Sequence, residues 1–300
     1  MLPFKLNYPV HAIDKTQLLP AGSLLTPEKL NEVIAAVQKT PIVKIPFLSH
    51  GSIKKDLSHF TNLLPYRIIF ENIKKTTKFF EVIKTLQFPL PLFKMLDYFQ
   101  EYDFYTYRHM LIVFAMSTLL TQELLEEPQN QFRGTILGPT HDFGKICIPL
   151  TILKKTTPLT LEERQILEHH ALAGFVLLTY YFQDKDIPDI IIARDHHERR
   201  NGSGYPRGVH VKDKMTEIVI ATDIFDALVS PRPYRKIFYD NRTALEEITL
   251  MAEIGELDWQ VVQALVGLNR KGHIHYSECS VSLEKRGEAP MENFYGVCSS

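Results

Sequence analysis

Half of the twelve histidines of this 300-residue chain lie in one stretch of 89 residues, from His109 to His197. Within this stretch His141 directly precedes Asp142, and His196 directly precedes His197. Imidazole and carboxylate groups together are typical ligands of borderline divalent metals such as iron, manganese, nickel and zinc. A lone His109 in a buried helix is more often a hydrogen-bonded core residue, so only the whole set indicates a site. If separate helices of a bundle carry these side chains inward, the set predicts a metal centre.

The adjacent pair His141 and Asp142 predicts a centre with two metal ions. Neighbouring side chains on a helix diverge by about 100°, so the two cannot point the same way. We expect Asp142 to bridge two ions and His141 to bind one of them. Lys145 follows at a spacing that places it on the same helical face. A fixed cation there would neutralise the charge of a phosphodiester in its transition state; the alternative is an ion pair between Lys145 and a neighbouring carboxylate.

The scaffold that must position these residues is expected to be mainly α-helical. The chain is 45% hydrophobic and 23% charged, which is typical of globular proteins and excludes general disorder or a collagen-like fibre. Residues 106–126 are apolar almost all round, as in a helix buried inside a bundle, and Thr160 with Glu163 predicts a capping box. Helices are expected at about residues 27–37, 66–86, 106–126, 140 onward, 160–178, 188–197, 215–229, 242–254 and 258–269.

Three regions are expected along the chain. Residues 1–95 are predicted to form a small α+β regulatory or docking domain, with an edge strand near residues 42–47. An all-helical bundle is expected over residues 96–270, after a proline-rich break at residues 88–92. Residues 271–300 are polar and irregular, so we expect a surface tail.

The charge of the chain is unevenly distributed. Residues 1–95 carry 13 Lys+Arg against 6 Asp+Glu, a net of +7, and the other 205 residues carry 21 against 29, a net of −8. The two parts are expected to attract each other, or the basic part to meet an anionic partner. No run of lysine or arginine exceeds two residues, so no nucleic acid polymer is expected as a partner.

Cysteine usage and hydropathy predict a cytoplasmic protein. The three cysteines, Cys147, Cys279 and Cys298, are odd in number and far apart, so they do not form a disulfide framework. The first residues lack the basic and apolar regions of a secretory signal. The longest apolar run, residues 110–120, is too short to span a bilayer.

Six short segments occur in a fixed order within residues 100–270. They are TYRH at 106–109, HDFGKI at 141–146 followed by IP at 148–149, HHER at 196–199, GSGYP at 202–206, DIFDAL at 223–228 and RPYR at 232–235. In their order and spacing these segments resemble the motifs of the HD-GYP subgroup of the HD-domain metal-dependent phosphohydrolases.

The resemblance implies seven metal ligands, with Asp142 bridging two divalent ions that are iron or, alternatively, manganese, nickel or zinc. These residues are His109, His141, Asp142, His170, His196, His197 and Asp223. His170 is preferred to its neighbour His169 because it follows Glu162 by eight residues and precedes Gly174 by four, as in the family. His169 is expected to be a solvated helix residue.

The resemblance also implies a substrate and a reaction. Cyclic di-GMP would be opened to linear pGpG, and in some members cut further to GMP, with a metal-bound hydroxide as nucleophile and with Asp142 and Lys145 as the catalytic residues. The contacts implied for the substrate are Lys145, Arg232 and Arg235 with phosphate, and an entrance loop that contains Gly202, Gly204, Tyr205 and Pro206. Two alternatives stay open: a module that binds the dinucleotide or a signalling protein with little turnover, and a hydrolase of another nucleotide. A protein partner would bind through the N-terminal domain or the entrance loop.

The sequence departs from the family pattern at three places. Tyr105 stands four residues before His109, where some members have a glutamate associated with a third metal ion. Its presence favours two ions and hydrolysis that stops at pGpG. Asn201 replaces the usual aspartate before GSGYP, with an expected effect on loop geometry, and Pro139 stands where apolar residues normally precede the His-Asp pair.

Overall fold

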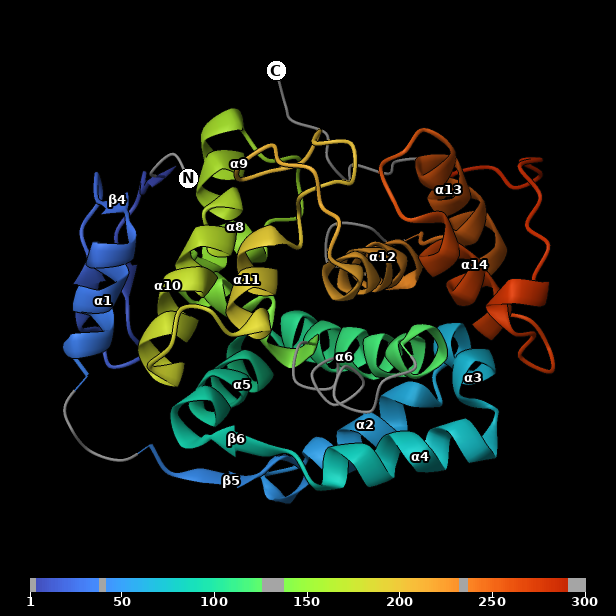
Figure 1. Cartoon of the computed structure of the whole chain (residues 1–300), viewed down its shortest axis with the longest axis horizontal. Coiled ribbons are helices and arrows are strands. Elements are labelled where there is room, and N and C mark those ends of the chain that lie inside the picture. The colour runs from blue at the N-terminus through green and yellow to red at the C-terminus, as the bar shows by residue number, and fades with distance from the viewer. Residues whose placement is uncertain (1–3, 38–41, 126–137, 232–236, 291–300) are drawn as a thin grey trace.

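The structure is a computed structural model that describes residues 4–37, 42–125, 138–231 and 237–290. Its helices dominate, and the strands form only two-stranded sheets. The predicted fold class, a helical bundle preceded by a small α+β region, is confirmed (Figure 1). Among the described helices none is long and apolar enough to cross a membrane.

The first part of the chain forms two short two-stranded sheets and one helix at the edge of the molecule, beside α10 (Figure 1). The elements are β1 Phe4–Lys5, β2 Val10–His11, β3 Gln17–Leu19, β4 Leu24–Leu25 and α1 Pro27–Ala35. Strand β1 pairs with β4 and β2 pairs with β3, both antiparallel. The predicted start of α1 is confirmed, because the Thr26 side chain accepts a hydrogen bond from the backbone N–H of Lys29.

The next part packs helices beneath α6 (Figure 1). Its elements are β5 Lys44–Pro46, η1 Phe47–Ser49, α2 Ile53–Thr61, α3 Leu64–Phe70, α4 Ile73–Lys84 and β6 Gln87–Pro89. Strand β5 lies within the predicted strand and pairs only with β6 among the described residues. The single helix expected over residues 66–86 is wrong. Asn72 interrupts it, because its side chain accepts a hydrogen bond from the N–H of Lys75 and starts a new helix.

Within the described residues, nine helices form the bundle. Figure 1 labels each of them. They are α5 Leu90–Tyr102, α6 Phe104–Leu124, α8 Leu150–Leu153, α9 Leu161–Glu168, α10 His170–Phe182, α11 Pro188–Asp195, α12 Lys214–Val229, α13 Asn241–Glu253 and α14 Trp259–Leu268. The predicted capping box of α9 is confirmed, since Thr160 and Glu163 cap each other's backbone reciprocally.

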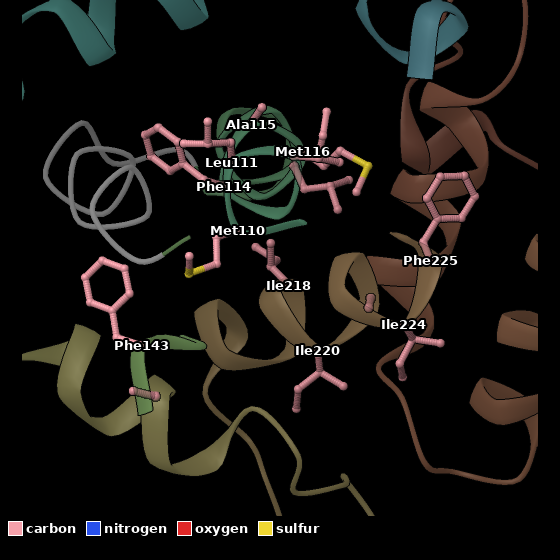
Figure 2. Packing of buried hydrophobic residues seen from close by; sticks show 14 of the residues in the cluster. Met110, Leu111, Phe114, Ala115, Met116, Phe143, Ile218, Ile220, Ile224 and Phe225 are labelled. Atoms are coloured by element: carbon pink, nitrogen blue, oxygen red, sulfur yellow. The ribbon is translucent and has the colours of Figure 1, made fainter. Parts of the chain in front are cut away.

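The core of the bundle lies between α6 and α12, which pack side by side and are buried along most of their length. Met110 of α6 faces Ile218 of α12 across this layer (Figure 2), whereas the Phe114 ring contacts Phe47 and Phe79. The same apolar cluster continues to Leu6, between β1 and β2, and, beyond α14, to Cys279. One large cluster therefore joins the described parts of the chain, beside a small second cluster of Val113, Ile192, Met215 and Val219. The domain boundaries stay a prediction.

Residues around the His-Asp pair do not form the α-helix that was expected from about residue 140. Two short 3-10 segments stand there instead, η2 Gly138–Thr140 and η3 Phe143–Cys147. Segment η3 lies against the backbone of α10, and a Cβ atom on Gly144 would come within 1.8 Å of the carbonyl oxygen of His170. Glycine is therefore required at residue 144 for this close approach, which brings the His-Asp pair to the start of α10.

Candidate metal centre

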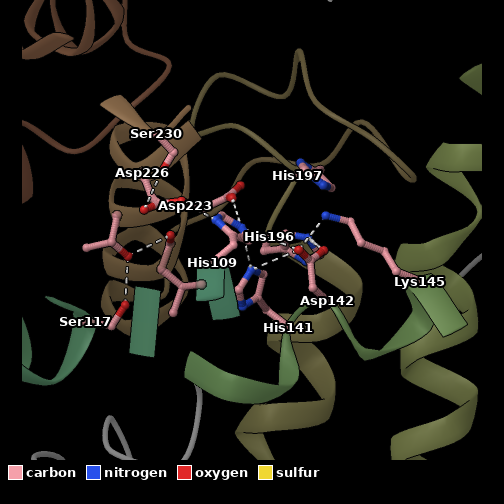
Figure 3. Close-up of polar contacts among 12 residues, drawn as sticks. His109, Ser117, His141, Asp142, Lys145, His196, His197, Asp223, Asp226 and Ser230 are labelled. Atoms are coloured by element: carbon pink, nitrogen blue, oxygen red, sulfur yellow. Dashed lines mark hydrogen bonds and ion pairs between the residues drawn. The ribbon is translucent and has the colours of Figure 1, made fainter. Parts of the chain in front are cut away.

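Five segments of the chain bring the seven expected ligands together beside α6 and α12, and Figure 3 labels all of them except His170. The contributions are His109 from α6, His141 and Asp142 from the segment between η2 and η3, His170 from the first residue of α10, His196 and His197 directly after α11, and Asp223 from α12. Six of the seven are buried and His197 is partly buried. Within the parts of the chain that the structure describes, the seven divide into two groups.

The first group, here called the acidic half, consists of His109, His141, Asp142 and Asp223. The Nε2 atom of His109 lies 3.0 Å from Asp223 Oδ1 and 3.4 Å from Asp142 Oδ2. His141 Nε2 lies 3.4 Å from His109 Nε2 and 3.5 Å from the same Asp142 oxygen. The coordinating atoms of His109, His141 and Asp142 all lie within 4.8 Å of one another, which is the spacing of ligands around a single cation.

The second group, here called the imidazole half, consists of His170, His196 and His197. Their ring nitrogens also lie within 4.8 Å of one another. His170 Nε2 is 3.3 Å from His196 Nε2 and 3.1 Å from His197 Nε2. The other oxygen of Asp142, Oδ1, faces this group at 3.5 Å from His170 Nε2 and 3.8 Å from His196 Nε2.

Asp142 stands between the two halves with one oxygen toward each. Its carboxylate is buried, and Oδ1 has no hydrogen-bond partner among the described residues. A buried carboxylate oxygen normally has a partner of opposite charge or a hydrogen-bond donor. A pair of divalent cations, one in each half, fits this unsatisfied oxygen and the nitrogen-rich surroundings.

Hydrogen bonds donated by Nδ1–H groups orient three of the imidazoles. His109 Nδ1 lies 2.6 Å from Asp226 Oδ2, His170 Nδ1 lies 2.6 Å from the carbonyl of Leu167, and His196 Nδ1 lies 3.0 Å from the carbonyl of Ala193. An acceptor at Nδ1 keeps the proton on that nitrogen and leaves the Nε2 lone pair for a metal ion. All three Nε2 atoms point into the centre.

The two halves differ in electrostatics. Burial alone would lower the pKa of His109, but hydrogen bonds and charge from Asp223 and Asp226 outweigh it and raise this pKa to about 9. In the imidazole half, burial lowers the pKa of His170 to about 4 and that of His196 to about 3. These two rings are therefore neutral near pH 7, the form that binds a metal ion.

Lys145 reaches the centre from the η3 segment. Its Nζ lies 2.5 Å from Asp142 Oδ2. Burial would raise the pKa of Asp142, but Lys145 and the surrounding histidines hold it well below its usual range. The ion pair left open by the sequence is thus present, and a phosphate contact of Lys145 stays a prediction.

The GSGYP loop folds back onto the segment that carries His197. The ring of Tyr205 stacks on the His197 ring with centroids 4.6 Å apart, and a Cβ on Gly204 would lie 2.3 Å from the carbonyl oxygen of His197. Gly202 adopts a φ of +80°, a conformation that favours glycine. Pro206 is partly buried within the same loop. The loop is thus fixed to the imidazole half.

Two carboxylates that support the site were not predicted as site residues. Glu198 is fully buried and accepts hydrogen bonds from the backbone N–H groups of Arg207 at 2.6 Å and Val209 at 3.0 Å, which fixes the loop. Asp226 holds His109. Both stand inside the quoted HHER and DIFDAL segments, so their positions were visible, but their roles require the fold.

Several sequence predictions about single residues were wrong or lie outside the described residues. His169 is not solvated: it is buried at the junction of α9 and α10, where the centroid of its ring lies 5.5 Å from that of the Tyr8 ring. Burial lowers the pKa of His169 to about 4. The helix expected to run through it is interrupted there. Arg232 and Arg235 lie outside the residues that the structure describes.

All three positions that depart from the family pattern are described, and Pro139 lies in η2, two residues before His141. Tyr105 stacks on His109 with centroids 5.8 Å apart. The side-chain oxygen of Asn201 accepts a hydrogen bond from the N–H of Ser203 at 3.0 Å and so shapes the loop. The carboxylate that is absent at residue 105 is therefore replaced by an aromatic ring against the acidic half.

Comparison with known proteins defines the class. The family model of the HD domain matches residues 96–261, more than half of the chain, so the protein belongs to the HD domain family. The buried histidines and aspartates of the centre lie within this matched region.

Three relatives illustrate the similarity. A cyclic di-GMP phosphodiesterase of Thermotoga maritima is 36% identical over 151 residues, which are 49% of this chain and 41% of that protein. One of Pseudomonas aeruginosa is 34% identical over 168 residues, 55% of this chain and 39% of that protein. A 3'3'-cGAMP-specific phosphodiesterase of Vibrio cholerae is 31% identical over 167 residues, 54% of this chain and 37% of that protein. The chain spans less than half the length of each of these relatives.

Proposed function

We propose that this protein hydrolyses a phosphodiester bond of a cyclic dinucleotide, and that cyclic di-GMP is opened to linear pGpG. The observation that carries the proposal is Asp142, which directs one oxygen to each of two groups of imidazoles. The names of the relatives supply the substrate class, a cyclic dinucleotide, and leave the choice between cyclic di-GMP and 3'3'-cGAMP to experiment.

The residues of the two halves are suited to hold two divalent cations. Bound there, such cations supply Lewis acidity for the diester and for the attacking water. Five imidazoles with two carboxylates favour iron or manganese over calcium or magnesium, which prefer oxygen ligands. Two cations with Asp142 and Asp223 leave a net positive charge, which attracts an anionic phosphodiester.

Other residues bind and orient the substrate in this proposal. Lys145 exchanges part of its contact with Asp142 for a phosphate oxygen and stabilises the charge that grows in the transition state. The loop from Gly202 to Pro206 forms the wall of the entrance, with the Tyr205 ring fixed against His197. Arg232 and Arg235 are proposed as further phosphate contacts, because a guanidinium binds two phosphate oxygens at once.

The end point of the reaction is proposed from residue 105. Tyr105 offers no carboxylate to a third cation beside His109, and its ring stacks on that histidine. Two cations suit one in-line displacement. We therefore expect pGpG to accumulate and GMP to form slowly or not at all.

The test combines metal analysis with a product assay on one anaerobically prepared sample. We expect about two metal ions per chain, as the two halves imply, and conversion of cyclic di-GMP to pGpG on chromatography. 3'3'-cGAMP in a parallel reaction tells which dinucleotide is preferred. Tight binding of either dinucleotide by protein with both ions, but without product, would contradict the proposal and favour a binding module.

A further inference from the structure

Arg108 is a partly buried cation next to the acidic half that the mechanism above does not use. It precedes His109 on α6, and its guanidinium carbon lies 5.5 Å from the centre of the Tyr105 ring. The Tyr105 ring in turn stacks on the His109 ring, with only 12° between their planes. Arg108, Tyr105 and His109 thus form a continuous stack at the edge of the acidic half.

The guanidinium of Arg108 has one unused edge. Its Nε and Nη2 atoms are buried, and neither has a hydrogen-bond partner among the residues that the structure describes. These two N–H groups point in the same direction and form the fork with which arginine binds two acceptors at once.

Two other arginines show what this edge does when an acceptor is present. Arg194 binds Asp195 through Nε at 2.7 Å and Nη2 at 2.8 Å. Arg207 binds the same carboxylate through Nε at 3.2 Å and Nη2 at 2.6 Å. In Arg108 the equivalent pair of donors makes no such contact within the described chain.

The carboxylate that supports the neighbouring His109 is already occupied. Asp226 binds Nδ1 of His109 at 2.6 Å, and it also accepts hydrogen bonds from the hydroxyls of Tyr66 and Ser230. A guanidinium cannot lose its proton at any cellular pH. Two buried donors without an acceptor are costly, so the arrangement points to an acceptor that arrives with a ligand.

We infer that the Nε–Nη2 edge of Arg108 binds two adjacent acceptor atoms of the substrate beside the acidic half. Two parts of a cyclic dinucleotide present such a pair: the non-bridging oxygens of a phosphate, and the O6–N7 edge of guanine. The inference rests on the proposed function and adds a binding contact to it. An adenine base offers N7 beside an amino donor instead and does not match two donors.

The experiment compares Arg108→Gln and Arg108→Lys with the wild type, all loaded with metal. KM and kcat are measured for cyclic di-GMP, 3'3'-cGAMP and cyclic di-AMP, and a dissociation constant is measured for a phosphorothioate analogue of cyclic di-GMP. Metal content and melting temperature are recorded for each sample. Arg242→Gln is the matched control, because it removes the same charge from an exposed residue paired with Glu246.

We expect Arg108→Gln to raise KM and the dissociation constant about tenfold to hundredfold, the effect of losing a bidentate contact. Arg108→Lys should recover only a small part of this loss, because an ammonium group has no fork. A phosphate contact predicts equal losses for all three dinucleotides. A contact with guanine predicts the largest loss for cyclic di-GMP and none for cyclic di-AMP.

Two results would overturn the inference while the proposed function stands. One is an unchanged KM and dissociation constant in an active Arg108→Gln protein that keeps its metal. The other is full recovery by Arg108→Lys, since that would show a role for charge alone. If the wild type neither binds nor cleaves any of the three dinucleotides, the proposed function fails and the Arg108 inference fails with it.

Discussion

The acidic half and the imidazole half of the centre are built by different means. His109 of α6 and Asp223 of α12 are 114 positions apart in the sequence. The side-chain carboxylate of Asp226 orients His109. His170 begins α10 and His196 follows α11, and backbone carbonyls three residues earlier in the chain, those of Leu167 and Ala193, orient them. The first half depends on packing between distant helices, the second on local helix geometry.

The charges of the two halves differ accordingly. Carboxylates raise the pKa of His109 to about 9, whereas burial lowers the pKa of His170 to about 4. The carboxylates of the acidic half attract a cation by charge, and a cation bound there displaces the extra proton of His109, whereas the imidazole half offers nitrogen donors that are already neutral. We expect the acidic half to bind its cation more tightly. Asp142 is the residue that both halves share.

The largest effect is expected from Asp142→Asn, which removes the shared carboxylate. Both halves lose a ligand, so metal content should fall well below that of the wild type. Turnover of cyclic di-GMP should fall about a thousandfold, because Lewis-acid stabilisation contributes several kcal/mol. Elemental analysis and a product assay check this. Retention of full metal content would contradict a bridging role for this residue.

His170→Ala should separate the halves. We expect the imidazole half to lose its cation and the acidic half to keep one, so that metal content is halved. The matched control is His169→Ala, which removes an adjacent buried imidazole that belongs to neither group. It should keep the metal content but lower the melting temperature, because the Tyr8 contact is lost. Equal loss of metal in both variants would contradict the division of the ligands into two groups.

Asp226→Asn should weaken the acidic half alone. The amide cannot accept the Nδ1 proton of His109 with the strength of a carboxylate, and loss of such a support typically costs 10–100-fold in metal affinity. Competition with a chelator measures the two affinities. Asp97→Asn is the control, because Asp97 is half-exposed and pairs with His50 away from the centre. A loss of metal affinity confined to the imidazole half would contradict this prediction.

The smallest effect is expected at a buried carboxyl group, that of Asp189, on α11. This helix leads to His196 of the imidazole half. Asp189 is buried, its Oδ1 has no partner among the described residues, and burial raises its pKa from 3.8 to about 7. The folded state keeps a proton that the unfolded chain loses, so the free energy of unfolding falls as pH rises from about 4 to about 7.

Asp189→Asn removes the ionisable group, and with it the loss of stability that the wild type shows as pH rises. We expect its melting temperature to exceed that of the wild type by on the order of 5 °C at pH 8, and to differ little at pH 4. Thermal unfolding at both pH values tests the expectation. A shift of equal size at both would show that the gain does not come from the carboxyl charge.

The sequence predicted most of the helices because their patterns are local. Thr26 and Thr160 marked helix starts that the structure confirms, and the apolar run from residue 106 matches buried α6. It failed where contacts between elements decide the backbone. Gly144 must approach α10 closely, so a 3-10 segment stands where a helix was expected, and His169 turns toward Tyr8 instead of solvent.

The sequence by itself determined which residue types are present for a metal centre and in what order, because motif spacing is a property of the chain. Only the tertiary structure decided that Asp142 directs its two oxygens to different groups and that Asp226 holds His109. It alone also shows that two donors of Arg108 have no partner among the described residues. Spacing fixes where a side chain stands on its own element. The distance between elements depends on how α6 packs against α12 and η3 against α10, which local patterns do not encode.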